Sequence, residues 1–125
     1  MVVRNELSDE QIDRVFQALA ASTRRDILRR TIAEEQSVSE LARDYDMSFA
    51  AVQKHVAVLE AAELIIKRAE GRERLVRANP EMIARARALL SRYEDLWRSR
   101  IARLDDLLAE DDTDTGLASR GSTSP

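Results

Sequence analysis

The sequence predicts a mainly helical domain that carries one small β-hairpin. Apolar residues recur every three or four positions over most of the chain, which is the period of an amphipathic helix. Glycine occurs 3 times and proline 2 times, too rarely for the frequent turns of an all-β fold. The helical period is lost between residues 64 and 77, where short β-like runs flank a glycine.

Length and composition limit the chain to one ordinary globular domain. It has 125 residues, of which 44% are hydrophobic and 34% charged. It has no cysteine and 1 histidine, which removes disulfides, thiolate nucleophiles and most metal sites. We therefore expect no metal and no cofactor. Composition does not exclude an enzyme, but no nucleophile or phosphate-binding glycine loop lies near the carboxylates, so we expect no enzymatic activity. No apolar run reaches the roughly 20 residues of a membrane span, so we expect a cytoplasmic protein with no membrane partner.

Cap signals and apolar stripes predict two helices near the start of the chain. Ser8 and Gln11 have the spacing of a capping box, which predicts a helix from Asp9 to Ala20. Ser22-Thr23 can cap a second helix. The apolar stripe of that second helix consists of Ile27, Leu28 and Ile32.

The next two helices have the outline of a helix-turn-helix motif. Ser37-x-x-Glu40 is a second capping box and starts a short helix over Val38–Tyr45. Residues 46–47 are enough only for a tight turn. A fourth helix, capped by Ser48, then reaches about Ala62. Two short helices joined by so tight a turn are typical of helix-turn-helix domains.

The β-like runs follow the fourth helix directly. Residues 64–68 and 74–77 predict a hairpin with its tip near Glu70-Gly71. A hairpin in this place is a wing, so we predict a winged helix-turn-helix with the order helix, helix, helix, helix, strand, strand, helix. Asn79-Pro80 provides a cap and a first-turn proline for the last helix, which should end near Glu110.

One face of the fourth helix favours DNA binding. Phe49, Val52, Val56 and Leu59 should pack on the second and third helices. The opposite face holds Ala50, Gln53, Lys54 and Ala57. This face is small and has one charge, so it can enter a groove, where glutamine can pair with adenine and alanine can meet a thymine methyl. The alternative is an ordinary solvated face.

Basic side chains beside this face are candidates for phosphate contacts. His55 lies on the flank of the helix, where either a phosphate contact or a structural role is open. Wing arginines can follow phosphates or enter a minor groove, although charge on an exposed edge strand is common in itself. Arg77 is expected too far from the tip. The predicted DNA-binding residues are Ser48, Ala50, Ala51, Gln53, Lys54, His55, Arg68, Arg72 and Arg74.

The last helix is the candidate for dimerisation. Its apolar residues recur in steps of three and four over a length that a domain of this size cannot cover, which indicates a partner chain. The alternative is a helix packed only on its own domain. The first helix is the expected companion surface. The predicted interface residues are Val15, Phe16, Leu19, Leu90, Tyr93, Trp97, Ile101, Leu104 and Leu108.

The charge is distributed unevenly along the chain. Residues 110–125 contain four acidic side chains and one basic side chain. Their net charge of −3 equals the net charge of the whole chain. Residues 48–77 contain six basic and four acidic side chains. We therefore assign residues 1–110 to a DNA-binding and dimerisation domain. Residues 111–125 form an acidic, Ser/Thr/Gly-rich tail that we expect to be disordered.

From Val15 to about Leu108 the chain resembles the ArsR family of small winged-helix repressors. Four segments in order carry the resemblance, namely residues 19–28, 39–42, 47–59 and 71–72. It implies a homodimeric transcriptional regulator, usually a repressor that an inducer releases from its operator. The third helix lacks the cysteines of the metal-sensing branch. Glu63 replaces the family's helix-ending glycine, so we expect that helix to end differently.

The predicted function is sequence-specific DNA binding in transcriptional regulation. Two-fold symmetry of a homodimer predicts a palindromic double-stranded DNA operator. A small-molecule inducer of unknown identity is an open expectation. The alternative is a winged-helix adaptor that recruits a protein partner without reading DNA sequence. The uncharged face beside a basic wing favours the first interpretation, because an adaptor does not require it.

Overall fold

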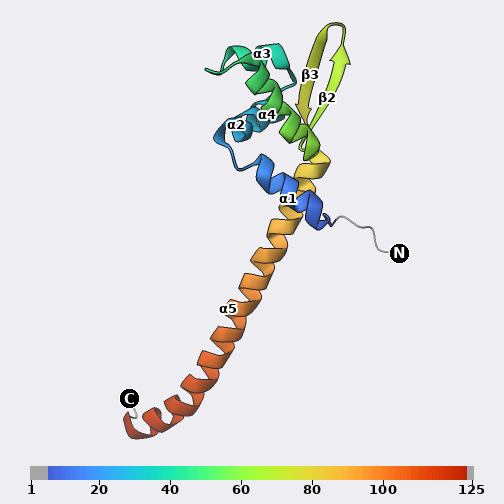
Figure 1. Cartoon of the computed structure of the whole chain (residues 1–125). Coiled ribbons are helices and arrows are strands. Elements are labelled where there is room, and N and C mark those ends of the chain that lie inside the picture. The colour runs from blue at the N-terminus through green and yellow to red at the C-terminus, as the bar shows by residue number, and fades with distance from the viewer. Residues whose placement is uncertain (1–5, 124–125) are drawn as a thin grey trace, which may run out of the picture. The chain divides into compact units, whose positions relative to one another are not determined.

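The computed structural model describes residues 6–123, with side chains through Asp111 (Figure 1). The chain divides into two compact units, one ending at Leu89 and one beginning at Leu90. The elements are α1 (Asp9–Ala18), α2 (Ser22–Ala33), β1 (Gln36–Ser37), α3 (Val38–Arg43), α4 (Phe49–Ala61), β2 (Ile65–Glu70), β3 (Glu73–Ala78) and α5 (Pro80–Thr123). The structure is mostly helical with a small antiparallel sheet, which is the predicted fold class.

The predicted caps of α1, α3 and α4 are confirmed in detail. Both capping boxes form, at Ser8 and at Ser37, and the hydroxyl of Ser48 accepts the backbone N–H of Ala51 at 3.1 Å. The start of α2 differs from the prediction, because the N-cap is Ala21 and no side chain caps that helix. Here Arg25 Nη1 instead donates to the carbonyl of Leu19 at 2.7 Å, joining α2 to the end of α1.

The wing is the hairpin β2–β3, residues 65–78, and its tip lies at Gly71-Arg72, one residue beyond the predicted place. Gly71 has φ 62°, the left-handed conformation that a tight turn of this kind requires. Strand β1 was not predicted; it pairs Gln36 with Val76 and Ser37 with Leu75 in the order β1-β3-β2. Two residues are too few to show a strand period.

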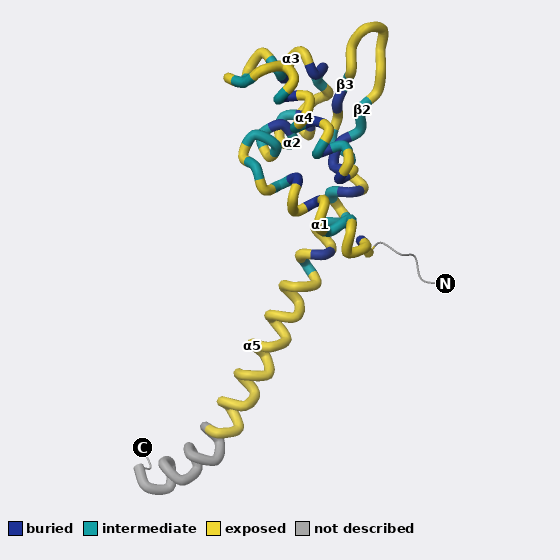
Figure 2. Tube along the Cα trace, viewed as in Figure 1, coloured by how far each residue is buried: buried dark blue, intermediate teal, exposed yellow. Residues whose placement is uncertain are grey.

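The core of the first unit lies between α1–α4 and the sheet (Figure 2). Its fully buried large side chains include Ile27, Leu41, Val52, Val56, Leu59, Leu64, Ile65 and Val76. Two predicted core residues are not in it: Phe49 is 47% exposed and Ile32 is 59% exposed. Each lies at the end of its helix, where the apolar stripe of that helix extends beyond the elements that pack on it. No helix in residues 6–123 is long and apolar enough to span a membrane.

The end of α4 corrects one expectation drawn from the missing glycine. Glu63 itself adopts the left-handed conformation, with φ 61°. The N–H of Leu64 bonds to the carbonyl of Leu59 at 3.1 Å and that of Glu63 to Glu60 at 2.9 Å, which is a Schellman ending. Asn79 Nδ2 donates to the Glu63 carbonyl at 2.9 Å and holds the turn. The helix therefore ends as a glycine would end it, at a cost in strain.

Replacing Glu63 by glycine is expected to raise the free energy of unfolding by roughly 0.5–1 kcal/mol. The left-handed conformation costs a residue with a Cβ about 1–2 kcal/mol, and the greater freedom of glycine in the unfolded chain offsets part of that gain. Urea denaturation measures the difference. Glu63→Ala is the control, because it keeps the Cβ and should give no gain. A less stable Glu63→Gly protein would contradict the strain assigned here.

The second unit is the continuation of α5 from Leu90 to Thr123. Its predicted end near Glu110 is wrong, and the disorder expected for residues 111–125 does not match the helix through Thr123. A helix that already exists adds residues without a new nucleation step, and the first proline after Pro80 is Pro125. Residues 124 and 125 lie outside the described part.

Candidate nucleic-acid interface

Helix α4 is held by its buried face and leaves the opposite face open. Val52, Val56 and Leu59 are at most 1% exposed and fix the helix in the core. A shallow depression of about 520 Å³ covers the other face. Six predicted positions line it, namely Ser48, Ala50, Ala51, Gln53, Lys54 and Ala57. Four of these six side chains, the serine and the three alanines, are short, so a flat surface such as a base-pair edge can approach the helix closely between Gln53 and Lys54.

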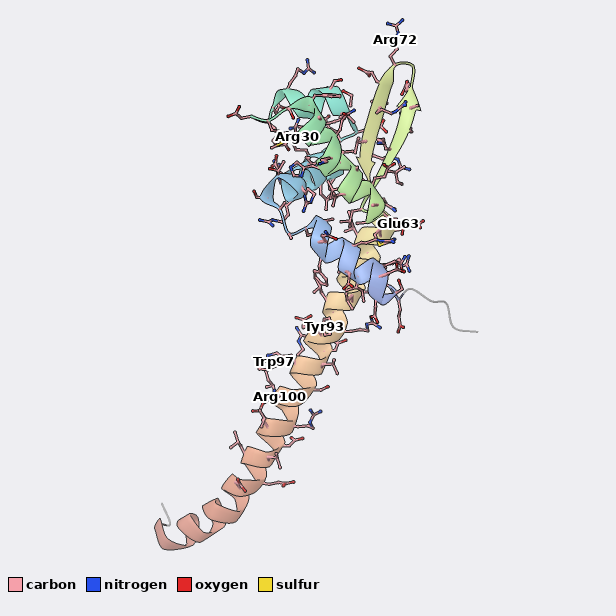
Figure 3. The ribbon with its side chains drawn as sticks, viewed as in Figure 1. Arg30, Glu63, Arg72, Tyr93, Trp97 and Arg100 are labelled. Carbon is pink, nitrogen blue, oxygen red and sulfur yellow. The ribbon has the colours of Figure 1, made fainter. Side chains whose placement is uncertain are left out.

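A second groove, of about 570 Å³, separates α4 from the wing. Gln53 lines this groove as well as the α4 depression, so it stands at the border of both surfaces. Arg72 and Arg74 line it from the wing tip, and Phe49 lines it from the start of α4. Figure 3 shows Arg72 extending from the tip of the hairpin. The groove brings the predicted base reader and two predicted phosphate contacts to one surface.

Sequence reasoning missed Ser39 and Phe49 as members of this surface. The α4 stripe placed Phe49 on the packing face, but the helix begins at that residue and nothing covers its ring fully. Ser39 lies in the first turn of α3 and lines the same groove. Its polarity was the available signal, although exposed serines are too common to mark a site.

Arg68 differs from the other two predicted wing arginines because carboxylates already hold it. Its guanidinium lies 2.9 Å from Glu35 and 2.9 Å from Glu70. The hydrogen bond from Glu35, then that from Glu70, raises the pKa of Arg68. With the side chains of residues 6–111, Arg72 and Arg74 form no such pairs. A phosphate contact by Arg68 would therefore have to compete with two carboxylates.

His55 is bonded to another helix in the free protein. Arg24 Nη1 lies 3.1 Å from His55 Nδ1, and Arg24 also donates to the carbonyls of Ala18 at 2.9 Å and Gln17 at 3.0 Å. Because arginine can only donate, Nδ1 accepts and the ring is neutral with its proton on Nε2. Burial, then the charge of Arg24, lowers the pKa of His55. His55 thus has the structural role of joining α4 to α2 through Arg24, and its Nε2–H remains as a donor for a phosphate.

A polar network fixes the helix-turn-helix turn to α2. Tyr45, in that turn, donates its hydroxyl to Asp26 at 2.5 Å. Arg30 lies 5.5 Å from the centre of the Tyr45 ring and donates to Asp44 and Gln36, each at 2.7 Å. The Tyr45 hydroxyl, followed by Arg29, holds the pKa of Asp26 below its usual range. These contacts fix the orientation of α3 and the turn that leads into α4.

Replacing Tyr45 by phenylalanine is expected to lower the free energy of unfolding by about 1 kcal/mol at pH 7. The lowered pKa of Asp26 means that this bond stabilises the fold above the usual carboxyl range, and that its contribution is lost as the pH falls through the folded-state pKa. The difference between the two proteins should therefore shrink at a pH well below the usual carboxyl range. Urea denaturation at both pH values tests it, with Tyr93→Phe as the control. An equal loss at both pH values would contradict it.

The predicted dimer residues fall into two groups. On α1, Val15 is 3% exposed and lies in the core of its own chain, Leu19 packs partly against that core, and Phe16 is 46% exposed. Val15 therefore offers no surface to a partner. On the second unit, every predicted side chain is exposed, from 40% at Ile101 to 61% at Leu108. Trp97, at 59%, has Arg100 5.9 Å from its ring centre (Figure 3).

Among the side chains that the structure describes, residues 6–111, no group of three or more histidine, cysteine or carboxylate side chains could hold a metal ion. The arrangement is instead that of a binding surface. It offers an amide, short alkyl groups and a cation on one helix face, with two unpaired guanidinium groups on an adjacent hairpin. These are groups that recognise base edges and phosphates.

Comparison with known proteins supports this interpretation. A helix-turn-helix domain model matches residues 19–68. The HTH-type transcriptional regulator Rv2034 of Mycobacterium tuberculosis is 36% identical over 103 residues, covering 82% of this chain and 94% of that protein. An ArsR-like transcriptional regulator from Rhodococcus sp. RHA1 has a TM-score of 0.70 at 31% identity, covering 78% of this chain and 92% of its own.

A third similar protein, of known structure, bears on assembly. The homodimeric winged helix-turn-helix DNA-binding domain of Mb0332 from Mycobacterium bovis, a possible ArsR-family regulator, has a TM-score of 0.56 at 28% identity. It covers 71% of this chain and 88% of its own.

Fold and surface together define a winged helix-turn-helix transcriptional regulator, a class that acts by binding DNA rather than by catalysis. The chain belongs to the ArsR family of these regulators.

Proposed function

We propose that the chain is a cytoplasmic, homodimeric repressor that binds a palindromic operator through α4 and the wing. The observation that carries the proposal is the shared position of Gln53, at the border between the open face of α4 and the groove beside the wing. A helix inserted in a major groove would present Gln53, Ala50 and Ala57 to base edges. Its wing would then meet the adjacent phosphates through Arg72 and Arg74.

The other predicted contacts take secondary places in this proposal. Lys54 and the Nε2–H of His55 reach the phosphate backbone beside the helix, and the N-terminus of α4 at Ser48 and Ala51 favours a phosphate as well. Arg68 mainly fixes the wing, because Glu35 and Glu70 hold its guanidinium.

Homodimerisation is supported by the second unit and by one relative. Large apolar side chains at 90, 93, 97, 101, 104 and 108 repeat in steps of three and four and are all exposed in the single chain. The similar domain from Mycobacterium bovis is homodimeric. The repressor role is taken from the ArsR resemblance, and residues 111–125 are proposed as an acidic extension outside the DNA-binding domain.

Selection from a pool of random duplexes tests the proposal directly. We expect enrichment of a sequence with two inverted half-sites about one helical turn apart, or a small multiple of it. Fluorescence anisotropy with the enriched duplex and a scrambled duplex of equal length then measures the preference. If no duplex is preferred, the proposal fails and a protein-recruiting adaptor takes its place.

Phe49 is expected to contribute a thymine contact within the same interface. Its ring is 47% exposed at the first residue of α4, and an apolar ring can cover a thymine methyl. Replacing one thymine per half-site by deoxyuridine removes two methyl contacts from the dimer complex and should weaken binding about 15-fold, or about fourfold for each buried methyl group. Phe49→Ala should remove this difference, whereas deoxyuridine at flanking positions should have no effect. If Phe49→Ala keeps the full difference, another residue makes the contact.

A further inference from the structure

A third groove, of about 630 Å³, lies in the first unit away from the DNA-binding surface. It is bounded by the end of α2, the end of β3 and the first two turns of α5. Its lining residues are Thr31, Ile32, Glu34, Glu35, Arg77, Ala78, Pro80, Ile83, Ala84 and Arg87. The volume falls in the range of small-molecule sites, which is roughly 300–1,000 Å³.

The middle of this groove is apolar. Ile32 is 59% exposed, so most of its side chain is open to a ligand in the groove. Ala78, Pro80, Ile83 and Ala84 contribute further apolar surface from β3 and α5. The hydroxyl of Thr31 already donates to the carbonyls of Ile27 and Leu28, each at 3.0 Å. It therefore needs no hydrogen-bond partner on a ligand. An apolar body of moderate size would bury this surface.

The charges at its rim favour an anion. Neither Arg77 nor Arg87 has a hydrogen bond or an ion pair within the described part of the chain, and both are exposed. Glu35 is neutralised by its ion pair with Arg68, which leaves Glu34 as the one unpaired carboxylate among the lining residues. We propose that this groove binds a small amphipathic organic anion, with its carboxylate at Arg77 and Arg87 and its apolar body on Ile32 and Ile83.

The groove is also connected to the wing through one side chain. Glu35 lines the groove, and its carboxylate accepts from Arg68 Nε at 3.2 Å and Nη2 at 2.9 Å. Arg68 lies on β2, so this pair joins the end of α2 to the hairpin that carries Arg72 and Arg74. An anion held at Arg77 and Arg87 adds negative charge to the groove that Glu35 also lines, so it competes with Glu35 for the guanidinium of Arg68 and weakens the pair that fixes the wing. The ligand therefore lowers operator affinity, a consequence that rests on the DNA-binding function proposed above.

Titration of the full chain with 2-naphthoate, followed by backbone amide NMR shifts, tests the site without DNA. We expect saturable shifts confined to residues 31–35 and 77–87, and binding of the neutral 2-naphthamide at least about fivefold weaker. Arg87→Gln and Ile32→Asn, both at exposed positions, should each weaken naphthoate binding by a similar factor. Arg43→Gln, an exposed arginine on α3 outside the groove, is the control. Shifts confined to residues 90–111, or equal binding of the amide, would overturn the site.

Operator binding with and without saturating 2-naphthoate tests the connection. Anisotropy should show an affinity about fivefold lower with the ligand, and the operator should weaken ligand binding by the same factor, because coupling is reciprocal. Glu35→Gln should keep ligand binding and lose this effect on DNA. Groove binding with unchanged operator affinity would overturn the connection. Failure of the chain to prefer any duplex would instead contradict the proposed function, and the NMR result would still decide the site.

Discussion

Replacing Trp97 by glutamate is expected to convert the protein from a dimer to a monomer at micromolar concentration. Trp97 is 59% exposed in the single chain and lies at the centre of the apolar repeat from Leu90 to Leu108. An unpaired carboxylate buried in a helix–helix interface costs several kcal/mol, so the dissociation constant should rise by about 100-fold or more. Because the side chain is exposed in the monomer, the fold of each chain should be preserved.

Sedimentation equilibrium measures this effect, with circular dichroism to show that the helix content is retained. Ser99→Glu is the matched control, because position 99 lies on the opposite side of the same helical turn and is exposed. It adds the same charge and should leave the dimer intact. A wild-type mass of 14.2 kDa at micromolar concentration would show that no dimer forms. A dimeric Trp97→Glu protein would place the interface elsewhere.

Loss of the dimer should also reduce operator binding strongly. Separate molecules then bind the two half-sites, and the gain in effective concentration from joining two DNA-binding domains disappears. The expected loss is at least about 100-fold on the palindromic duplex and much smaller on a single half-site. Equal losses on both duplexes would mean that Trp97→Glu damages the DNA-binding domain itself.

Replacing Gln53 by alanine is expected to cost roughly 1–3 kcal/mol on the preferred operator, or about 5- to 150-fold in affinity. The amide of Gln53 is exposed on α4 and lies at the border of the two interface surfaces. Its loss should relax the preference at one base position in each half-site and leave binding to scrambled DNA nearly unchanged. Fluorescence anisotropy on both duplexes distinguishes these outcomes.

The wing arginines provide the contrasting result. Arg72→Ala and Arg74→Ala each remove a cation that has no carboxylate partner among the described residues, so both duplexes should be weakened similarly. The slope of log affinity against log salt should also become less steep, by about 0.9 for each phosphate that a subunit no longer neutralises. Arg68→Ala should change this slope less, because Glu35 and Glu70 already neutralise that side chain. Equal weakening of both duplexes by Gln53→Ala would show that it does not read bases.

Local features of the sequence determined the order of elements and the open face of α4. A capping box is complete within four residues, so Ser8 and Ser37 show their role without any tertiary contact. The α4 period is equally local: Val52, Val56 and Leu59 must share a face whatever they pack against. The same spacing places Gln53 and Lys54 on the opposite face. For this reason the fold class and the open face of α4 could be predicted from the residues alone.

The tertiary structure decided how each candidate side chain is used, because partners distant in sequence are invisible to spacing. Glu35 holds Arg68 across 33 positions, and Arg24 holds His55 across 31. Phe49 and Val15 both belong to apolar stripes, yet Phe49 is exposed and Val15 is buried, since exposure depends on which element lies opposite. The groove that Ile32 lines is a further example, because it forms only where α2, β3 and α5 meet. Periodicity assigns a residue to a face, and only packing determines what covers that face.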